Sequence, residues 1–532
     1  MPEVLFTGGT VLLMDEHFGE ADALLVRDNR IAAVGTAQAV TAEAGADAAH
    51  YDLDGRALIP GFNDNHIHLA NMADRERTPS LAGLSKAEII ERVREAYADA
   101  SPGEWLIATQ WDYPSCPDPH LGDLDSAFPD NPVALFQFSG HAAWLNSRAL
   151  ATLGISAETP DWDRGGVDVD ADGRLTGIIR EPFGAPGVRG LFQKCFTDPA
   201  AMRQNLPVAF SHLNRHGITS VQDNTWFPHV HDAYSELCEA GDVTVRISCW
   251  LMGDSPDLVS AMEAKSYYPH RIEQGPLKYF LDGAFSSRTA WLVEPYRGEH
   301  GNYGTGVPAA EIVRKLESFV LKRRQVASHA IGDRAVREYL KAAEELSSRY
   351  PYLPELRIRV EHGQLIQPDD IPRLARLGFH VSAQPHAAAS PEKDIDLLGT
   401  ERARRAYPYR SLLDAGVSLS FGSDFPGEGS FEPLLGIHYA VNREGPEAIT
   451  PAEALRAYTA GSAYAQFAEA DKGTLEPGKL ADLVVLSADP TRIDPERIRD
   501  IDVELTMMDG TVVYAGDAAP MPAKNHASTS HV

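Results

Sequence analysis

The sequence predicts an α/β protein whose main body is a (β/α)8 TIM barrel, accompanied by a small composite β-sandwich domain built from both chain ends. Eight apolar, strand-like segments alternate with amphipathic helical segments, and both ends of the chain carry only short strands separated by turns. A long stretch that interrupts the alternation after the first barrel strand predicts an insertion. A doubly wound open sheet would show the same alternation and is the structural alternative.

Both chain ends show the same pattern of short predicted strands separated by turns. Residues 1–56 contain apolar runs such as VLFT and IAAVGT, separated by turn signals. Residues 472–520 contain ADLVVLSAD and a hairpin signal at Asp509-Gly510. Because neither end is long enough for a stable sheet alone, we expect 1–56 and 472–520 to form one composite β domain. Residues 521–532 lack periodicity and are predicted to be a loose tail.

Residues 57–70 plus 201–471 carry the barrel pattern. Between the strands, apolar residues recur three and four positions apart, as Ile312, Leu316 and Val320 do, which is typical of a helix with one buried face. Eight strands, each followed by helical sequence, are the number that closes a barrel. The predicted strands are 57–64, 218–223, 244–250, 277–282, 325–329, 356–362, 379–384 and 417–424.

Residues 71–200 do not follow the alternation. Only one strong core-like strand, PVALFQF at 132–138, stands among loops rich in Trp, Gly and Pro, and Asp172-Gly173 marks a hairpin turn. Long insertions between barrel elements commonly shape the mouth of the active site. We therefore expect residues 71–200 to lie over the barrel mouth.

The composition excludes several classes of function. The 532 residues include 48 Lys and Arg against 76 Asp and Glu, a formal net charge of −28 at pH 7. A polyanion without a Lys/Arg cluster is not expected to bind nucleic acid or an anionic membrane. The longest apolar runs are too short for a bilayer, and the start of the chain does not resemble a secretory signal. The four cysteines form no paired pattern, so we expect reduced thiols and a cytoplasmic location.

The tetrapeptide Asn65-His66-Ile67-His68 ends the first predicted barrel strand. Residues two apart in a strand face the same side, so His66 and His68 would project together, as half of a Zn²⁺ site does. An isolated H-x-H is more often two half-exposed histidines near a turn. Here, however, His329, His362 and Asp424 also stand at the ends of strands. Barrel active sites are assembled from such ends, so the combination predicts a metal site at the barrel mouth.

Lys278 lies inside the apolar segment GPLKYFLDG. A buried charged lysine is costly without a partner, so one interpretation is a structural ion pair with Asp282 or a side chain that reaches solvent. In the other interpretation, burial keeps the amine neutral and reactive. A neutral amine can take up CO₂ to form a carbamate, which is an anionic ligand able to bridge two metals. The residues alone leave both interpretations open.

Several longer motifs point to a known family. The segments GFNDNHIHL, LKYFLDGAFSSRTAWLVEPY, SHAIGDRAV, RVEHGQLI and YPYRSLLDAGVSLSFGSDFP resemble those of the amidohydrolase superfamily. The sequence is most similar to its amidohydrolase-3 branch, which includes N-substituted formamide deformylases. The later segment AYTAGSAYAQFAEADKGTLEPGKLADLVVL fits the same branch. The resemblance covers essentially the whole chain, with the motifs in the expected order.

This resemblance implies a metal-dependent hydrolase with one or two divalent ions, and Zn²⁺ is expected. By motif position, His66 and His68 would bind the more buried metal. Lys278 matches a lysine that is carboxylated and bridges the two ions. His329 and His362 match the histidine ligands of the fifth and sixth strands.

The implied chemistry is cleavage of a C–N bond in an amide-like small molecule, N-acyl or N-formyl, by metal-activated hydroxide. Asp424 matches the aspartate of the eighth strand, which is both a ligand and the proton shuttle to the leaving nitrogen. The alternatives keep the same centre but change the reaction to that of a cyclic-amide or ester hydrolase, a deaminase or a decarboxylase. A catalytically silent binding protein is the alternative from another class.

Other residues are candidates for supporting roles. Trp111, His141, Phe285 and Arg288 are predicted to contact the substrate, and the segment around His141 resembles a motif in the family's insertion. Asp64 lies two residues before His66, where it would support a ligand or cap a turn. A homodimer is the default expectation for the oligomeric state.

Overall fold

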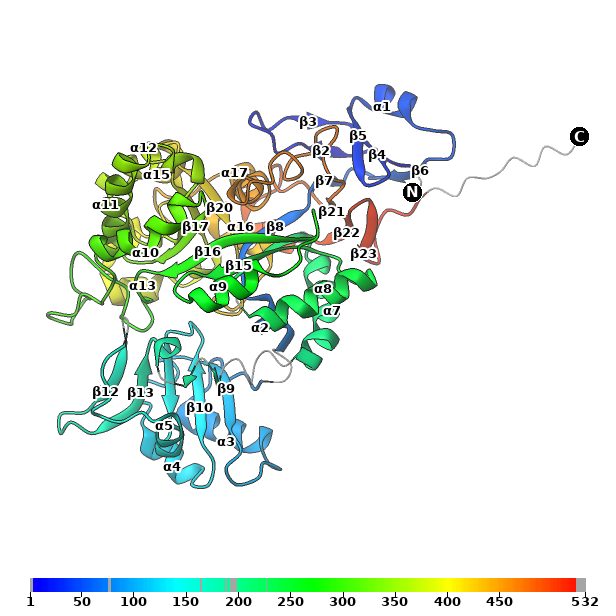
Figure 1. Ribbon diagram of the computed structural model, residues 1–532. Helices are drawn as coiled ribbons and strands as arrows, with labels where there is room; N and C mark the ends of the chain where they lie inside the picture. The colour runs from blue at the N-terminus through cyan, green and yellow to red at the C-terminus, as the bar shows by residue number, and fades with distance from the viewer. Residues whose placement is uncertain are drawn as a thin grey trace, which may run out of the picture.

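A computed structural model describes residues 3–74, 78–162, 165–185, 187–188, 190–191, 199–225 and 227–522. Figure 1 shows a central barrel, with the sheets of the chain ends on one side and the insertion on another. None of the described helices is long and apolar enough to cross a membrane. The predicted loose tail lies outside the described residues from position 523 onward.

An eight-stranded sheet forms the centre of the molecule, in the order β20-β19-β18-β17-β16-β15-β14-β8, and every neighbouring pair is parallel. This order follows the chain without the reversal that defines a doubly wound sheet. The predicted (β/α)8 barrel is therefore confirmed, and the open-sheet alternative is wrong. The strands are β8 Phe62–Ile67, β14 Ile218–Asp223, β15 Arg246–Met252, β16 Ile272–Phe280, β17 Val326–Ala330, β18 Arg359–His362, β19 His380–Ala383 and β20 Ser418–Phe421.

Helices connect the barrel strands and bury the apolar stripes seen in the sequence. On α10, for example, Ile312, Leu316 and Val320 are buried at helical spacing. The connecting helices after β14, β15, β16 and β17 are α8 Pro228–Ala240, α9 Pro256–Glu263, α10 Ala309–Leu321 and α11 Asp333–Arg349. The others are α2 Leu69–Asp74, α7 Pro199–Arg215, α12 Ile371–Arg376, α13 Pro391–Leu398, α14 Thr400–Arg405, α15 Tyr409–Asp414, α16 Pro433–Asn442, α17 Pro451–Arg456 and α18 Ser462–Ala465.

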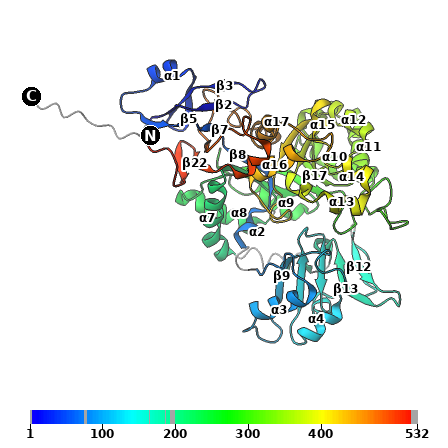
Figure 2. The ribbon, with the colours of Figure 1, turned by 180° about the vertical axis from the view of Figure 1, so that it is seen from behind.

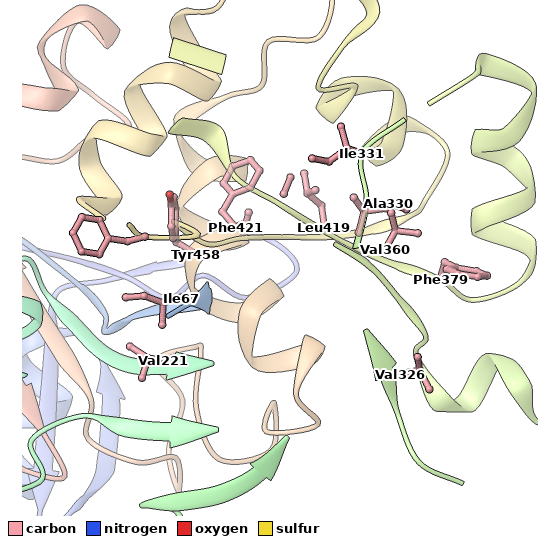
Figure 3. Close-up of a cluster of buried hydrophobic side chains, with 14 of the residues drawn as sticks. Ile67, Val221, Val326, Ala330, Ile331, Val360, Phe379, Leu419, Phe421 and Tyr458 are labelled. Atoms are coloured by element: carbon pink, nitrogen blue, oxygen red, sulfur yellow. The ribbon is translucent and has the colours of Figure 1, made fainter. Parts of the chain in front are cut away.

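One continuous apolar core joins the barrel to these helices. Val221, Val360 and Phe421, from three different barrel strands, are buried with Tyr458 (Figure 3). Fully burying an aliphatic or aromatic side chain of this size contributes about 1.5–3 kcal/mol, so the core fixes the strands firmly. Residues at the C-terminal ends of those strands are consequently held in fixed relative positions.

The barrel closes between β8 and β20, and the contact between these two strands differs from that between the other neighbouring barrel strands. Among the described residues, no ladder pairs these two strands. Instead, the Asp424 backbone N–H donates to the His66 carbonyl at 2.6 Å, and the Ser423 N–H donates to Asp64 Oδ1 at 2.9 Å. Gly422 makes the approach feasible, because a Cβ there would lie 2.5 Å from the His66 nitrogen.

The two chain ends share one sheet. A six-stranded sheet has the order β23-β22-β21-β7-β2-β3, and β7 from the N-terminal part pairs antiparallel with β21 from the C-terminal part. A four-stranded sheet, β5-β4-β1-β6, shares an apolar core with it. The strands are β1 Val4–Thr7, β2 Thr10–Leu12, β3 Glu20–Ala21, β4 Ala23–Arg27, β5 Arg30–Gly35, β6 Ala49–Asp52, β7 Ala57–Pro60, β21 Leu483–Leu486, β22 Val503–Met508 and β23 Thr511–Ala515.

The predicted strand at 57–64 proves to be two strands in different sheets. β7 belongs to the six-stranded sheet, and β8 begins the barrel only at Phe62. The break falls at Gly61, which packs so closely against Thr219 that a Cβ would collide with that side chain. Both strands are buried throughout, and the turn-type dipeptide Pro60-Gly61 was the only local sign of the break in this run.

The segment between β8 and β14 forms a five-stranded sheet in the order β12-β13-β11-β10-β9, seen from both sides in Figures 1 and 2. The sequence showed only one strong strand here. β12 and the start of β13 are only partly buried and lack an apolar signature, whereas β9 and β11 are buried strands that were not predicted. The elements are β9 Leu106–Trp111, β10 Val133–Gln137, β11 Ala142–Leu145, β12 Gly166–Val169 and β13 Leu175–Arg180, with helices α3 Lys86–Ala96, α4 Leu121–Ala127 and α5 Ser147–Leu153.

Candidate metal centre

A cavity of about 240 Å³ lies between the C-terminal ends of the barrel strands and the insertion. The insertion contributes Phe136, Phe138, His141, Glu181 and Phe183 to its wall. The structure brings all six predicted metal-ligating residues to this cavity: His66, His68, Lys278, His329, His362 and Asp424. The chemistry-bearing side chains therefore meet on the face where barrel enzymes place their active sites.

The Asp424 carboxylate lies among three imidazoles. Its Oδ1 is 3.2 Å from His68 Nε2 and 3.6 Å from His66 Nε2, and its Oδ2 is 3.9 Å from His362 Nδ1. One ligand atom from each of His66, His362 and Asp424 falls within 4.8 Å of the others. Imidazole nitrogens with a carboxylate are the donors that Zn²⁺ and related divalent ions prefer.

His362 provides the test of whether the residues fit a metal. Arg359 and Glu361 face the barrel interior, so regular strand alternation would point the His362 side chain outward, toward the helices. The backbone of His362 is instead left-handed, with a φ of 73°, which breaks this alternation. The side chain is 4% exposed, yet neither ring nitrogen has a hydrogen-bond partner among the described residues. Buried polar atoms are normally satisfied, so a bound cation is the partner that this imidazole fits.

His329 and Lys278 complete the far side of the cluster. The His329 ring lies 4.4 Å from that of His362, and its Nε2 donates to the Gly283 carbonyl at 2.9 Å, which leaves Nδ1 as the acceptor nitrogen. Lys278 is 1% exposed, and its Nζ lies 3.5 Å from His66 Nε2 and 4.8 Å from the centre of the Phe280 ring. The lysine amine is thus buried beside the imidazoles rather than extended to solvent.

The electrostatics favour the protonation states that bind a metal. Burial, reinforced by the Lys278 charge, lowers the pKa of His66 to about 4. Burial likewise lowers the pKa of His362 to about 3. Burial alone would raise the pKa of Asp424, but the facing imidazoles, His66 first, outweigh it and hold the pKa below the usual range. At neutral pH the imidazoles of His66 and His362 are therefore neutral and the Asp424 carboxylate is ionised, as metal binding requires.

Two supporting residues were missed in the sequence. Glu361 Oε2 accepts a hydrogen bond from His66 Nδ1 at 2.6 Å, and the carboxylate is fully buried. Asn224 contacts both early histidines, because its carbonyl lies 3.1 Å from His68 Nδ1 and its side-chain nitrogen 3.1 Å from His66 Nε2. In LRIRVEH charged residues alternate with apolar ones, and an acidic residue directly before His362 was the signal available for Glu361.

Asp64 acts on the backbone rather than on a ligand ring. Its Oδ1 accepts hydrogen bonds from the N–H groups of His66 and Ser423, at 3.1 and 2.9 Å. Burial raises the pKa of Asp64 to about 7, so the group sits in a strongly desolvated position. Of the two roles considered from the sequence, the structure shows the capping one.

Three predicted substrate contacts lie away from the cavity. Trp111 is fully buried in the core of the insertion, where Nε1 donates to the Leu135 carbonyl. Phe285 packs into the barrel core, and Arg288 is a half-exposed residue paired with Glu299. A sequence does not reveal whether an aromatic or cationic side chain faces a core, the solvent or a cavity. The prediction that these three residues line the substrate site was therefore wrong. His141 alone of the four lines the cavity.

His141 is held by a carboxylate that the sequence did not single out. Glu181 Oε2 accepts from His141 Nδ1 at 2.8 Å, and Glu181 Oε1 accepts from the Thr289 hydroxyl at 2.9 Å. Glu181 adopts a left-handed φ of 49°, a conformation that non-glycine residues keep only where the surroundings enforce it. The His141 ring centre lies 5.0 Å from that of His329, so the insertion reaches the edge of the candidate metal centre.

A (β/α)8 barrel with histidines, a lysine and an aspartate gathered at its mouth defines the class of metal-dependent hydrolases. Comparison with known proteins places the chain within that class. The model of the Amidohydrolase family matches residues 49–514, and the chain belongs to this family. It is an enzyme that hydrolyses carbon–nitrogen bonds other than peptide bonds, and its family uses a divalent metal.

Individual relatives support the assignment over the full length. The chain is 30% identical to the protein YtcJ of Bacillus subtilis, over 96% of this chain and 99% of that protein. It is 28% identical to the N-substituted formamide deformylase of Arthrobacter pascens, over 97% and 98% of the two chains. The crystal structure of a metal-dependent hydrolase from Pyrococcus furiosus matches 93% of this chain and all of its own, with 28% identity and a TM-score of 0.70.

Proposed function

We propose that the chain hydrolyses the amide bond of an N-acyl or N-formyl small molecule. The observation that carries the proposal is the grouping of His66, His362 and Asp424 within 4.8 Å at the floor of a 240 Å³ cavity. A cavity of about that size suits a compact substrate rather than a polymer. The relationship to an N-substituted formamide deformylase supports this substrate class.

The residues fit a centre of one or two Zn²⁺ ions. His66, His68 and Asp424 would hold one ion, and Lys278, as a carbamate, would link it to a second ion held by His329 and His362. A divalent metal bound there would acidify water and polarise the substrate carbonyl. Neutral imidazoles at His66 and His362 and a buried amine at Lys278 are what this arrangement needs.

Asp424 is the residue that moves a proton. Its carboxylate is ionised and faces both the cavity and the histidines, so it can accept a proton from the attacking water. It then gives that proton to the leaving nitrogen, which would otherwise depart as a poor, anionic leaving group. His141, on the opposite wall, is positioned by Glu181 to contact the substrate.

The direct test is a substrate panel assayed with zinc-supplemented enzyme. N-formyl and N-acyl amines should be cleaved, with amine release measured, in preference to cyclic amides, esters, aminated heterocycles and carboxylic acids. Preferential turnover of one of the last four groups would replace the proposal by the cyclic-amide, ester, deaminating or decarboxylating alternative. Metal binding without turnover of any group would favour a silent binding protein.

Lys278→Ala is expected to lose most of the bound metal and the activity, because a carbamate supplies both a bridge and a negative charge. Bicarbonate should raise metal loading of the parent but not of the variant, as elemental analysis would show. Lys472→Met is the matched control, since Lys472 is also a buried lysine but donates to Ser220 and lies outside the cavity lining. Full metal content in Lys278→Ala would show that the lysine is only structural.

His141→Ala is expected to change the ratio of kcat/KM between substrates while metal content stays constant. Loss of one hydrogen bond to the substrate costs about 1 kcal/mol, roughly a five- to tenfold change in that ratio. Arg288→Ala should leave the ratio unchanged, because Arg288 pairs with Glu299 outside the cavity lining. Identical profiles for His141→Ala and the parent would remove His141 from the substrate site.

A cytoplasmic homodimer completes the proposal. The three cysteines in the described part of the chain, Cys116, Cys238 and Cys249, are free thiols, which suits a reducing compartment. Sedimentation of the purified protein would decide the oligomeric state.

A further inference from the structure

A buried ion pair lies beneath the candidate metal centre, and neither motif spacing nor the comparisons assign it a role. Glu361 and Arg359, two residues apart on β18, both face the barrel interior and are fully buried. Arg359 Nε donates to Glu361 Oε1 at 2.7 Å, and one terminal nitrogen lies 3.2 Å from Oε2. Buried charges are tolerated only when they are paired and hydrogen-bonded, as these are.

Arg359 is fixed by three other strands. It donates to the Gln222 side chain at 2.5 Å, to the Asn65 carbonyl at 3.0 Å and to the Ser382 hydroxyl at 3.2 Å. Its guanidinium also lies 4.8 Å from the centre of the Trp250 ring. Because its hydrogen-bond acceptors lie on β8, β14, β18 and β19, the guanidinium cannot move without disturbing the barrel, and Glu361 is held equally firmly.

Glu361 in turn determines how His66 can be used. An ionised carboxylate accepts hydrogen bonds but donates none, so the 2.6 Å contact requires that His66 Nδ1 carry the proton. The lone pair is then on Nε2, which lies 3.6 Å from Asp424 Oδ1 and 3.5 Å from Lys278 Nζ. Trp250 packs against the same imidazole with ring centres 4.9 Å apart, which restricts its rotation.

We infer that Glu361, anchored by Arg359, is a positioning residue that fixes the His66 imidazole with Nε2 directed at the metal site. The inference rests on the proposed metal centre and deepens it. Carboxylate partners of metal-bound histidines set ring orientation and raise ligand basicity, and their loss typically weakens metal binding about 10- to 100-fold.

The test measures Co²⁺ affinity of the apo-protein by competition with a chelator, together with the visible spectrum of the bound Co²⁺. Glu361→Gln should weaken Co²⁺ binding about 10- to 100-fold and alter the spectrum. In a His66→Ala background, the same substitution should change the affinity less than about twofold, because the residue acts through His66. Asp482→Asn is the matched control: Asp482 is a buried carboxylate paired with Arg246 at 2.7 Å outside the cavity lining, and its loss should leave Co²⁺ binding unchanged.

The possible outcomes separate the inference from the proposed function. If the parent protein binds no divalent metal, the proposed metal centre fails. If the parent binds Co²⁺ but Glu361→Gln matches it, or loses equal affinity with and without His66, the positioning role is overturned. Should Glu361→Gln not fold because Arg359 is left unpaired, the double variant Arg359→Met/Glu361→Gln removes both charges and is judged by the same criteria.

Discussion

Asp424→Asn is expected to lower turnover by about 10² to 10⁴, the usual contribution of a positioned acid–base group. Asparagine keeps the size of the side chain and one oxygen for a metal, but it cannot accept a proton. It also tolerates the left-handed φ of 51° found at position 424, so the backbone should be preserved. Steady-state amine release at saturating substrate is the measurement, with metal content determined on the same sample.

The accompanying controls separate chemistry from metal binding. Metal content should fall much less in Asp424→Asn than in His66→Ala, because only the latter removes an imidazole. Asp394→Asn changes another buried aspartate, one whose pKa burial raises to about 7 and which lies outside the cavity lining, and should leave turnover unchanged. Turnover close to the parent value in Asp424→Asn would mean that another group transfers the proton.

Removal of the metal is expected to abolish activity and to lower thermal stability. A ligand present at about 1,000 times its Kd stabilises the folded state by about 4 kcal/mol, and chelation withdraws that contribution. The effect should be visible as a fall in Tm by calorimetry after dialysis against a chelator. Zinc should restore both Tm and turnover, at about one to two equivalents by elemental analysis.

His66→Ala gives the reference for that experiment. Because this variant lacks an imidazole that faces the cluster, chelator should shift its Tm far less than that of the parent. Undiminished activity of a parent sample shown by elemental analysis to be metal-free would rule out the proposed mechanism altogether.

The barrel and the strand-end residues could be predicted because they leave strong local signals. Strands buried on both faces are continuous apolar runs, so a histidine or aspartate at the end of such a run is conspicuous, as His329 and Asp424 are. The parallel order of the strands then requires those ends to meet at one face. The grouping of the candidate ligands other than His362 therefore follows from pattern and topology together.

Other features depend on contacts that no local pattern contains. Alternation places Glu361 and His362 on opposite sides of β18, and only the left-handed backbone at His362 returns both to the centre. Trp111 was misplaced because an aromatic residue in a strand of the insertion looks the same whether it covers a core or a cavity. By contrast, the split between β7 and β8 was marked locally by the turn-type dipeptide Pro60-Gly61 and was nevertheless missed.

The seam between β8 and β20 would give a metal ion bound at the proposed centre a role in the persistence of the enzyme as well as in catalysis. His66 lies on one side of this seam and Asp424 on the other. An ion held by both would therefore link the β8 side to the β20 side where the backbone ladder is missing. Without the ion, local opening would begin there, and deuterium would reach the amides of β8 and β20 before those of β16 and β17. Cellular proteases act on such opened forms, so a cell short of metal would lose this protein by degradation as well as by inactivity.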